Sequence, residues 1–166
     1  VGSEFFGAAV VKRLKEINEQ GVNRTPCFPL ESGERQTDTS LNKIRLDHIS
    51  RYNWAITKLE KLLQDNNCIE GADVFCGNGY GASLLSNLGA VWAVDKSEEA
   101  IKIARKHYGL HGITYETGEY PFEIPVEKFD YVVSIESVEH VKQYKELVSA
   151  LVGSVKDGGY IIISTT

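Results

Sequence analysis

The chain has 166 residues, enough for one domain with a substantial core, and its 42% hydrophobic and 25% charged residues are typical of a globular protein. Its net charge of -5 argues against a general nucleic-acid-binding surface, which is usually basic. No apolar run reaches the ~18 residues of a membrane helix, so we expect no membrane partner. The three cysteines form no CxxC pair, which argues against a metal site and a disulfide framework and favours a reducing, cytoplasmic compartment.

The N-terminal third is predicted to contain two helices and a polar loop. Residues 5–17 have apolar residues at helical spacing, and residues 21–39 are rich in Thr, Ser, Pro and Gly. A second helix is expected to run from a cap at Thr39 or Ser40 to about Asp65. The residues predicted on its buried face are Ile44, His48, Tyr52, Ile56 and Leu59.

From Cys68 onwards, short apolar segments alternate with helical patterns. The predicted strands are 72–76, 90–94, 113–116, 129–135 and 160–164, and the predicted helices are 82–88, 97–108 and 144–155. Ser97 is expected to cap its helix. The alternation predicts an α/β fold, a three-layer Rossmann-like parallel sheet with helices on both faces. We expect residues 1–67 to form a helical cap and loop, and residues 68–166 to form the sheet domain, within one compact unit.

A glycine-rich segment, Asp73-Val-Phe-Cys-Gly-Asn-Gly-Tyr-Gly81, joins the first predicted strand to the next helix. Glycines there allow positive φ angles and a close approach of a ligand to the backbone, and the helix start offers unpaired N–H groups. Asp95 ends the second predicted strand, 18 residues after Gly77, where a carboxylate can accept hydrogen bonds from ribose hydroxyls. These features predict a site for an adenosine-containing ligand, and the alternative is a tight turn that only connects strand and helix.

The spacing alone leaves the class of ligand open. Gly77-x-Gly79-x-x-Ala82 also fits the dinucleotide fingerprint, so an NAD(P)-binding oxidoreductase domain is one alternative. Asp73 argues against it, because this strand is usually wholly apolar in dinucleotide domains. A carboxylate there suits a ligand that carries an ammonium and a sulfonium. In addition, about 68 residues precede the strand, whereas dinucleotide domains commonly begin with it.

The order of motifs resembles that of class I methyltransferases that depend on S-adenosylmethionine. The glycine-rich segment is similar to their first motif, and Val91-Trp-Ala-Val-Asp95 is similar to their second strand with its ribose-binding acid. Gly118-Glu119 resembles the Gly-Asp pair whose acid binds the adenine amino group, with Glu in place of Asp. Residues 129–140 resemble the fourth strand and its turn. Residues 155–164 resemble the Lys-Pro-Gly-Gly turn and fifth strand, with Asp157 replacing the proline.

The N-terminal region narrows this resemblance. Ser32-Gly-Glu-Arg35 and Leu46-Asp-His48-x-x-Arg51-Tyr52-x-x-Ala55 are similar to methyltransferases found near glycosyltransferase and polysaccharide genes, in which the stretch helps to cover the cofactor. The resemblance implies methyl transfer to a small molecule, on oxygen, with a sugar or glycan intermediate as the expected acceptor. The family normally continues with two more strands, so we expect a truncated chain or a shortened relative. A non-catalytic cofactor-binding protein is therefore a second alternative.

The resemblance implies more cofactor contacts than catalytic groups. The three loop glycines are expected to make room for the methionine portion, Asp73 to reach towards its ammonium, and Asp95 to clamp the ribose. The alternatives are that Asp73 caps loop amides and that Asp95 caps the next helix. The residues expected to bind S-adenosylmethionine are Asp73, Phe75, Cys76, Gly77, Asn78, Gly79, Gly81, Asp95, Lys96, Glu119, Tyr120, Glu136, Arg51 and Tyr52.

His140 and Glu139 are the candidate catalytic residues. They follow the fourth strand, at the edge where open α/β sheets bind ligands, and His140 can serve as a general base or contact the substrate. The alternative is that Glu139 caps a helix and His140 packs on the sheet. Arg51 is expected near the carboxylate of the cofactor, or else in solvent on a packed helix. Glu119 and Tyr120 are expected at the adenine or in a solvated loop, and Trp54 and Trp92 in the core.

Overall fold

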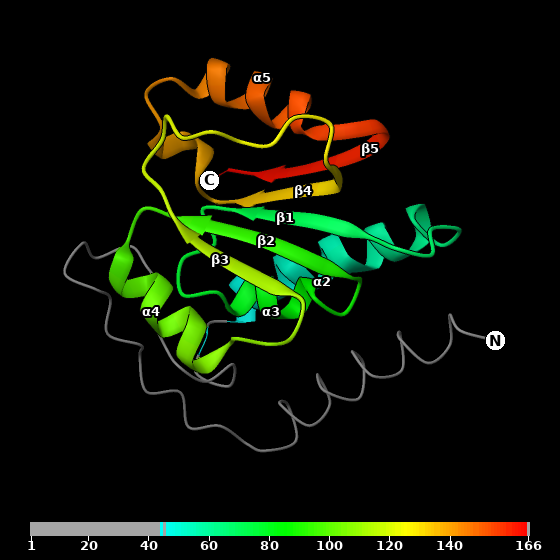
Figure 1. The fold of residues 1–166 in the computed structure, drawn as a ribbon, viewed down its shortest axis with the longest axis horizontal. Coiled ribbons are helices and arrows are strands. Elements are labelled where there is room, and N and C mark those ends of the chain that lie inside the picture. Colours follow the sequence, from blue (N-terminus) through cyan, green and yellow to red (C-terminus); the bar gives the residue numbers. More distant parts are fainter. Residues whose placement is uncertain (1–43, 45, 166) are drawn as a thin grey trace.

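Five parallel strands form the centre of the computed structural model, which describes Ile44 and residues 46–165 (Figure 1). The strands are β1 (Glu70–Val74), β2 (Ala90–Asp95), β3 (Ile113–Thr117), β4 (Phe129–Ile135) and β5 (Val155–Ser164). Their order is β3-β2-β1-β4-β5, so the chain moves outward from β1 to β3 and then returns to the other side of β1. Ligands of open α/β sheets bind beyond the carboxyl ends of the strands at such a switch point.

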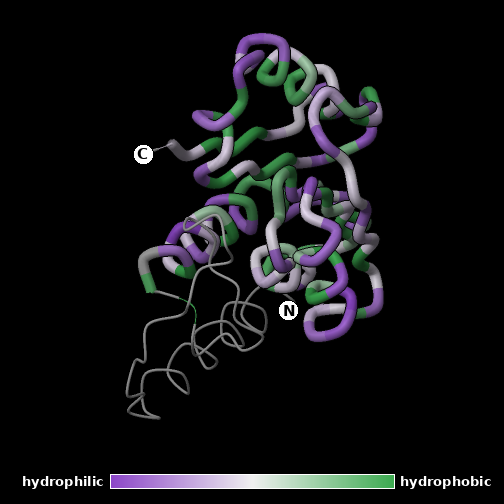
Figure 2. The backbone as a smooth tube through the Cα atoms, turned by 90° about the vertical axis from the view of Figure 1, so that its left-hand side faces the viewer, coloured by the Kyte–Doolittle hydropathy of each residue, from purple (hydrophilic) through white to green (hydrophobic). Residues whose placement is uncertain are grey.

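Helices cover both faces of the sheet, as predicted (Figure 1). The helices α2 (Leu46–Leu62), α3 (Tyr80–Leu85) and α4 (Glu98–His107) share one hydrophobic core with the first face. The helix α5 (Tyr144–Ser154) packs on the second face, and a short 3-10 helix, η2 (Val138–His140), follows β4. Figure 2 shows hydrophobic stretches through the sheet and hydrophilic ones in the outer turns. Within the described residues, every helix is too short or too polar to cross a membrane.

Local signals place several element boundaries correctly. The strand β4 has the predicted bounds, and six of its seven residues are buried because both faces of the sheet are covered there. Ser97 caps α4 as predicted, with its side chain accepting a hydrogen bond from the Ala100 amide at 3.2 Å.

Other boundaries differ from the prediction for structural reasons. The helix α3 begins two residues early, at Tyr80, because Gly79 ends the loop in a left-handed conformation with φ 84°. The strand β5 begins at Val155 instead of residue 160, since the Gly158-Gly159 turn forms an irregularity inside the strand. The predicted helix at 5–17, the loop at 21–39 and the cap at Thr39 or Ser40 lie outside the described residues.

The predicted apolar face of α2 packs on the sheet, but one tryptophan does not. Tyr52, Ile56 and Leu59 are buried, whereas Trp54 is 57% exposed, so its predicted place in the core is wrong. Trp54 lies on the outer face of α2, with the Lys58 ammonium 5.6 Å from its ring centroid. Trp92 is in the core as predicted.

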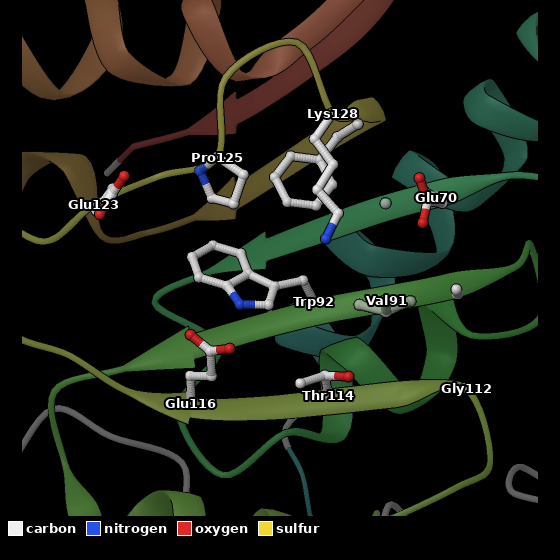
Figure 3. A pocket seen from close by; sticks show the side chains of 12 residues that line it. Glu70, Val91, Trp92, Gly112, Thr114, Glu116, Glu123, Pro125 and Lys128 are labelled. Carbon is white, nitrogen blue, oxygen red and sulfur yellow. The ribbon is translucent and has the colours of Figure 1, made fainter.

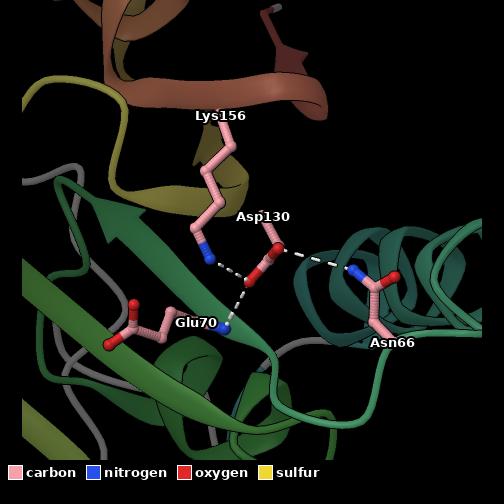
Figure 4. A network of polar contacts seen from close by, with 4 residues as sticks. All are labelled: Asn66, Glu70, Asp130 and Lys156. Atoms are coloured by element: carbon pink, nitrogen blue, oxygen red, sulfur yellow. Dashed lines mark hydrogen bonds and ion pairs between the residues drawn. The ribbon is translucent and has the colours of Figure 1, made fainter.

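Asp130 ties three segments together at the amino edge of the sheet (Figure 4). Its Oδ2 accepts hydrogen bonds from the Glu70 amide at 2.8 Å and from the Lys156 ammonium at 3.0 Å. Its Oδ1 is 3.4 Å from the Asn66 amide nitrogen. This carboxylate therefore links the segment after α2, the start of β1 and β5, at the edge opposite the switch point.

We expect Asp130→Ala to lower the free energy of unfolding by about 1–3 kcal/mol, because the Glu70 amide loses its charged acceptor in a partly buried place. Lys156→Ala is the matched control and should cost at most about 1 kcal/mol, since the lysine side chain is 40% exposed. Urea denaturation of both variants measures the difference. Equal losses of unfolding free energy in the two variants would contradict the claim that the Asp130 carboxylate stabilises this edge of the sheet.

Candidate functional site

The glycine-rich loop leaves β1 at Val74 and enters α3 at Tyr80, at the switch point of the sheet. Phe75, Gly77 and Gly79 have positive φ angles of 67°, 56° and 84°. The Cys76 amide donates a hydrogen bond to the Val94 carbonyl of β2 at 3.0 Å, and the Gly79 amide donates one to the Cys76 carbonyl at 3.1 Å. The loop is thus a tight turn anchored on the neighbouring strand.

The three glycines of the glycine-rich segment, Gly77 and Gly79 in the loop and Gly81 in α3, have different environments. A Cβ at Gly77 would have no heavy atom within 4 Å, so this residue faces open space. A Cβ at Gly79 would come within 2.6 Å of Ala104 and 2.7 Å of the Tyr115 hydroxyl. A Cβ at Gly81 would come within 2.1 Å of the Tyr52 ring. The protein's own side chains therefore fill the space beside Gly79 and Gly81. Of the three glycines, only Gly77 has open space beside it, as expected for a glycine that makes room for a ligand.

Asp95 binds the loop to the end of β2. Its Oδ2 accepts a hydrogen bond from the Gly77 amide at 3.0 Å, and its Oδ1 accepts one from the Ser97 amide at 2.8 Å. The carboxylate holds the start of α4, as the helix-cap alternative expects, and it also lies beside the open position at Gly77. Its role as a ribose clamp stays a prediction. A carboxylate can accept more than two hydrogen bonds, so these contacts are compatible with a further donor such as a ribose hydroxyl.

Asp73 lies beneath the loop with 0% exposure. Its carboxylate accepts a hydrogen bond from the Tyr52 hydroxyl, at 3.1 Å from Oδ1 and 3.4 Å from Oδ2, and another from the Ala82 amide. This is the loop-capping alternative of the sequence analysis. The expected reach towards the cofactor ammonium, directly or through water, stays a prediction. Burial raises the pKa of the Asp73 carboxyl to about 7, and the hydrogen bond from Tyr52 opposes that rise.

An ion pair connects α2 to the segment after β4. The Arg51 guanidinium lies 2.7 Å from the Glu136 carboxylate, and their side chains are 32% and 16% exposed. Glu136 has a φ of 49°, and its amide donates to the Ser164 carbonyl at 2.9 Å. Arg51 and Glu136 are far apart in the sequence, and both were predicted to contact the cofactor. The structure brings them together at the carboxyl edge of the sheet.

Aromatic side chains gather beyond the carboxyl end of β3. The Phe122 ring contacts those of Phe75 and Tyr120, with centroid distances of 6.0 Å and 5.8 Å. Glu119 and Lys96 are exposed on the neighbouring turns. Phe122 was not predicted as a site residue, because its position depends on the fold of an irregular segment.

The catalytic candidates lie on η2, directly after β4. Glu139 and His140 are exposed there, and the His140 amide donates to the Ser137 carbonyl at 3.1 Å. They follow a strand that pairs with β1, so they share the carboxyl edge with the glycine loop. Their catalytic role stays a prediction.

Tyr115 is a supporting residue that the sequence analysis missed. Its buried hydroxyl lies 3.1 Å from the carbonyls of Gly79 and Tyr108, so it props the loop from β3. The alternation of the predicted strand 113–116 places Tyr115 on the same face as Ile113, and that pattern was the available signal.

A groove of about 500 Å³ lies over β1, β2 and β3 on the second face of the sheet, the face that α5 packs against (Figure 3). Trp92 and Phe129 line it, with their rings stacked at 5.7 Å. The charged residues around it are Glu70, Glu116, Glu123 and Lys128. None of the predicted site residues lines this groove, so it is separate from the candidate site.

The different surroundings of the glycines predict different costs of substitution. Gly81→Ala should lower the free energy of unfolding by about 1–3 kcal/mol, because the new methyl group overlaps the Tyr52 ring. Gly77→Ala should cost about 1 kcal/mol, from the left-handed backbone alone. Chemical denaturation of the two variants tests this order, and a greater loss for Gly77→Ala would contradict it.

The buried Asp73 carboxyl should make stability depend on pH. Its pKa is about 7 in the folded chain against 3.8 when unperturbed, so the folded state holds its proton more tightly than the unfolded state. The penalty for burying the charge is therefore absent below about pH 4 and grows to about 4 kcal/mol as pH rises through 7. Asp73→Asn should flatten this fall in urea denaturation between about pH 4 and pH 8, with the wild type as reference. Parallel pH profiles of the two proteins would contradict it.

Comparison with known proteins agrees with this geometry. A family model described as a methyltransferase domain matches residues 72–163, which is more than half of the chain. The mitochondrial ubiquinone biosynthesis O-methyltransferase of Schizosaccharomyces pombe is 31% identical over 135 residues, covering 75% of this chain and 45% of that protein. The ubiquinone biosynthesis O-methyltransferase of Thiobacillus denitrificans is 38% identical over 99 residues, covering 56% and 42%.

A solved structure of an S-adenosylmethionine dependent methyltransferase from Mesorhizobium loti has the same fold, with a TM-score of 0.59 and 25% identity. The match covers 69% of this chain and 53% of that chain. The chain spans about half the length of the curated relatives it matches. From the parallel sheet, the loop at its switch point and these matches, we conclude that the chain belongs to the methyltransferase domain family, within the class I superfamily that depends on S-adenosylmethionine.

Proposed function

We propose that the chain binds S-adenosylmethionine at the glycine loop and Asp95, and that the protein to which it belongs transfers the methyl group to a small molecule. The observation that carries this proposal is the hydrogen bond from the Gly77 amide to the Asp95 carboxylate at 3.0 Å, beside a glycine that faces open space. Family membership supports the choice of this cofactor over NAD. Residues 68–166 would then be the cofactor-binding domain. The cap predicted at residues 1–67 lies largely outside the described residues.

The residues of the carboxyl edge fit the parts of this cofactor. Asp95 would accept hydrogen bonds from the ribose, and Gly77 would leave space for the chain that links ribose and methionine. The aromatic side chains of Tyr120 and Phe122 lie after β3, where the resemblance expects the adenine. Arg51 would exchange its contact with Glu136 for the carboxylate of the methionine portion.

When bound, S-adenosylmethionine supplies a methyl group on a positively charged sulfur. The contribution of the protein is to hold the cofactor and an acceptor oxygen in line and in contact. His140 would take the proton that the hydroxyl of the acceptor loses, since it follows β4 at the same edge. Glu139, next to it, is the second candidate for contact with the acceptor.

The acceptor we propose is a small molecule with a hydroxyl group. Several relatives are named as O-methyltransferases of ubiquinone biosynthesis, which supports attack by oxygen. The narrower expectation of a sugar or glycan intermediate rests on the resemblance of residues 32–55, part of which lies outside the described residues. A reducing cytoplasmic compartment is likewise still a prediction.

Titration calorimetry with S-adenosylhomocysteine and with NAD tests the binding half of the proposal. The wild type should bind S-adenosylhomocysteine, and Asp95→Asn should bind it at least about tenfold more weakly, because it loses charge-assisted hydrogen bonds to the ribose. Asp130→Asn, at the opposite edge, is the matched control and should bind as the wild type does. Binding of NAD without S-adenosylhomocysteine would refute the assignment.

A methyl-transfer assay with a panel of phenols and sugar derivatives tests the catalytic half. His140→Ala should keep cofactor affinity and lose most of the turnover, on the order of 100-fold. Unchanged turnover would remove the role of His140 as base. Cofactor binding without turnover of any acceptor would favour the non-catalytic alternative.

A further inference from the structure

The Tyr52 hydroxyl donates a hydrogen bond to the Asp73 carboxylate beneath the glycine loop. Tyr52 is buried, and its ring lies over Gly81, where a Cβ would come within 2.1 Å of it. The Tyr80 ring contacts it edge-on, with centroids 5.4 Å apart. This packing points the hydroxyl at Asp73, at 3.1 Å from Oδ1 and 3.4 Å from Oδ2. Tyr52 therefore contacts the site through Asp73, although the sequence analysis expected it to cover the cofactor.

The electrostatic neighbours that shift the pKa values of this pair, within the described part of the chain, are acids. Cys76 of the loop and Tyr80 of α3 act on Tyr52, and Asp95 of β2 acts on Asp73. Burial raises the pKa of Tyr115 in β3 and of Tyr131 in β4, and the Asp73 charge adds to that rise. Two hydrogen bonds, from the Tyr52 hydroxyl and the Ala82 amide, favour the ionised form of Asp73 against burial and these neighbours.

We propose that Tyr52 is a positioning residue that keeps the Asp73 carboxylate ionised and oriented behind the glycine loop, and so ties the affinity of the loop for a cationic cofactor to the docking of α2. This inference rests on the proposed function, since S-adenosylmethionine carries both an ammonium and a sulfonium. A negative charge in a dry interior acts on a nearby cation more strongly than a charge in water does. Asp73 thus contributes through its field while it remains fully buried.

The test compares Tyr52→Phe with a matched control, Tyr131→Phe. The first variant keeps the ring over Gly81 and loses the hydroxyl. The second loses another buried hydroxyl, one that lies 3.4 Å from the Leu85 carbonyl. Circular dichroism checks that both fold. Infrared difference spectra of the ligand-free proteins then follow the carbonyl stretch of protonated Asp73 across pH, assigned by its absence from Asp73→Asn.

In Tyr52→Phe the midpoint of this infrared titration should rise by about one pH unit relative to the wild type and Tyr131→Phe. The affinity for S-adenosylmethionine should fall about fivefold at pH 7 and return to nearly that of the wild type near pH 9, where Asp73 is mostly ionised in both proteins. An unchanged midpoint, or the same loss of affinity at both pH values, indicates a merely structural tyrosine and overturns the proposal.

The two measurements separate this inference from the proposed function. If the wild type binds no S-adenosylmethionine at any pH, the proposed function fails, while the infrared midpoints still decide whether Tyr52 holds the charge on Asp73. If Tyr52→Phe does not fold, 3-fluorotyrosine incorporated at position 52 replaces it. Its more acidic hydroxyl donates a stronger hydrogen bond and should lower the midpoint, and an unchanged midpoint again overturns the proposal.

Discussion

The site depends on one carboxylate, Asp95, which holds together three pieces of backbone. It accepts hydrogen bonds from the Gly77 amide and the Ser97 amide, at 3.0 Å and 2.8 Å, and it lies at the last residue of β2. These contacts fix the turn after β1, the end of β2 and the start of α4 relative to one another. The turn can then stay open at Gly77 without collapsing onto the sheet. This leaves a preformed edge, with a negative charge beside it, for the cofactor that we propose to bind there.

The helix α2 reaches this edge from a distant part of the sequence and makes two contacts there. The Tyr52 hydroxyl donates a hydrogen bond to Asp73 beneath the loop, and the Arg51 guanidinium forms an ion pair with Glu136 after β4. Both residues are adjacent in the chain, so any displacement of this turn of α2 disturbs the ends of β1 and β4 together. The packing of Gly81 against Tyr52 and of Gly79 against Tyr115 shows why the loop needs more than one glycine: it is held from both sides by rings.

The sequence predicted those features that local chemistry decides. The apolar run of β4, the Ser97 cap and the turn at Gly77 each carry their signal within a few residues. Features that depend on contacts between distant parts of the sequence were either not predicted or were explained by a different interaction. The ion pair of Arg51 and the partners of Gly79 and Gly81 depend on where α2 and β3 pack. The exposure of Trp54 is of the same kind, because hydrophobicity alone does not say which face of a helix a tryptophan occupies.

The most direct measurement of the central claim is a crystal structure of the protein with S-adenosylhomocysteine. The account predicts the nucleoside at the carboxyl edge of the sheet, with both ribose hydroxyls donating to the Asp95 carboxylate and the linking chain passing over Gly77. Electron density for the nucleoside in the groove over β1, β2 and β3, or a Gly77 edge filled by the protein's own side chains, would contradict it.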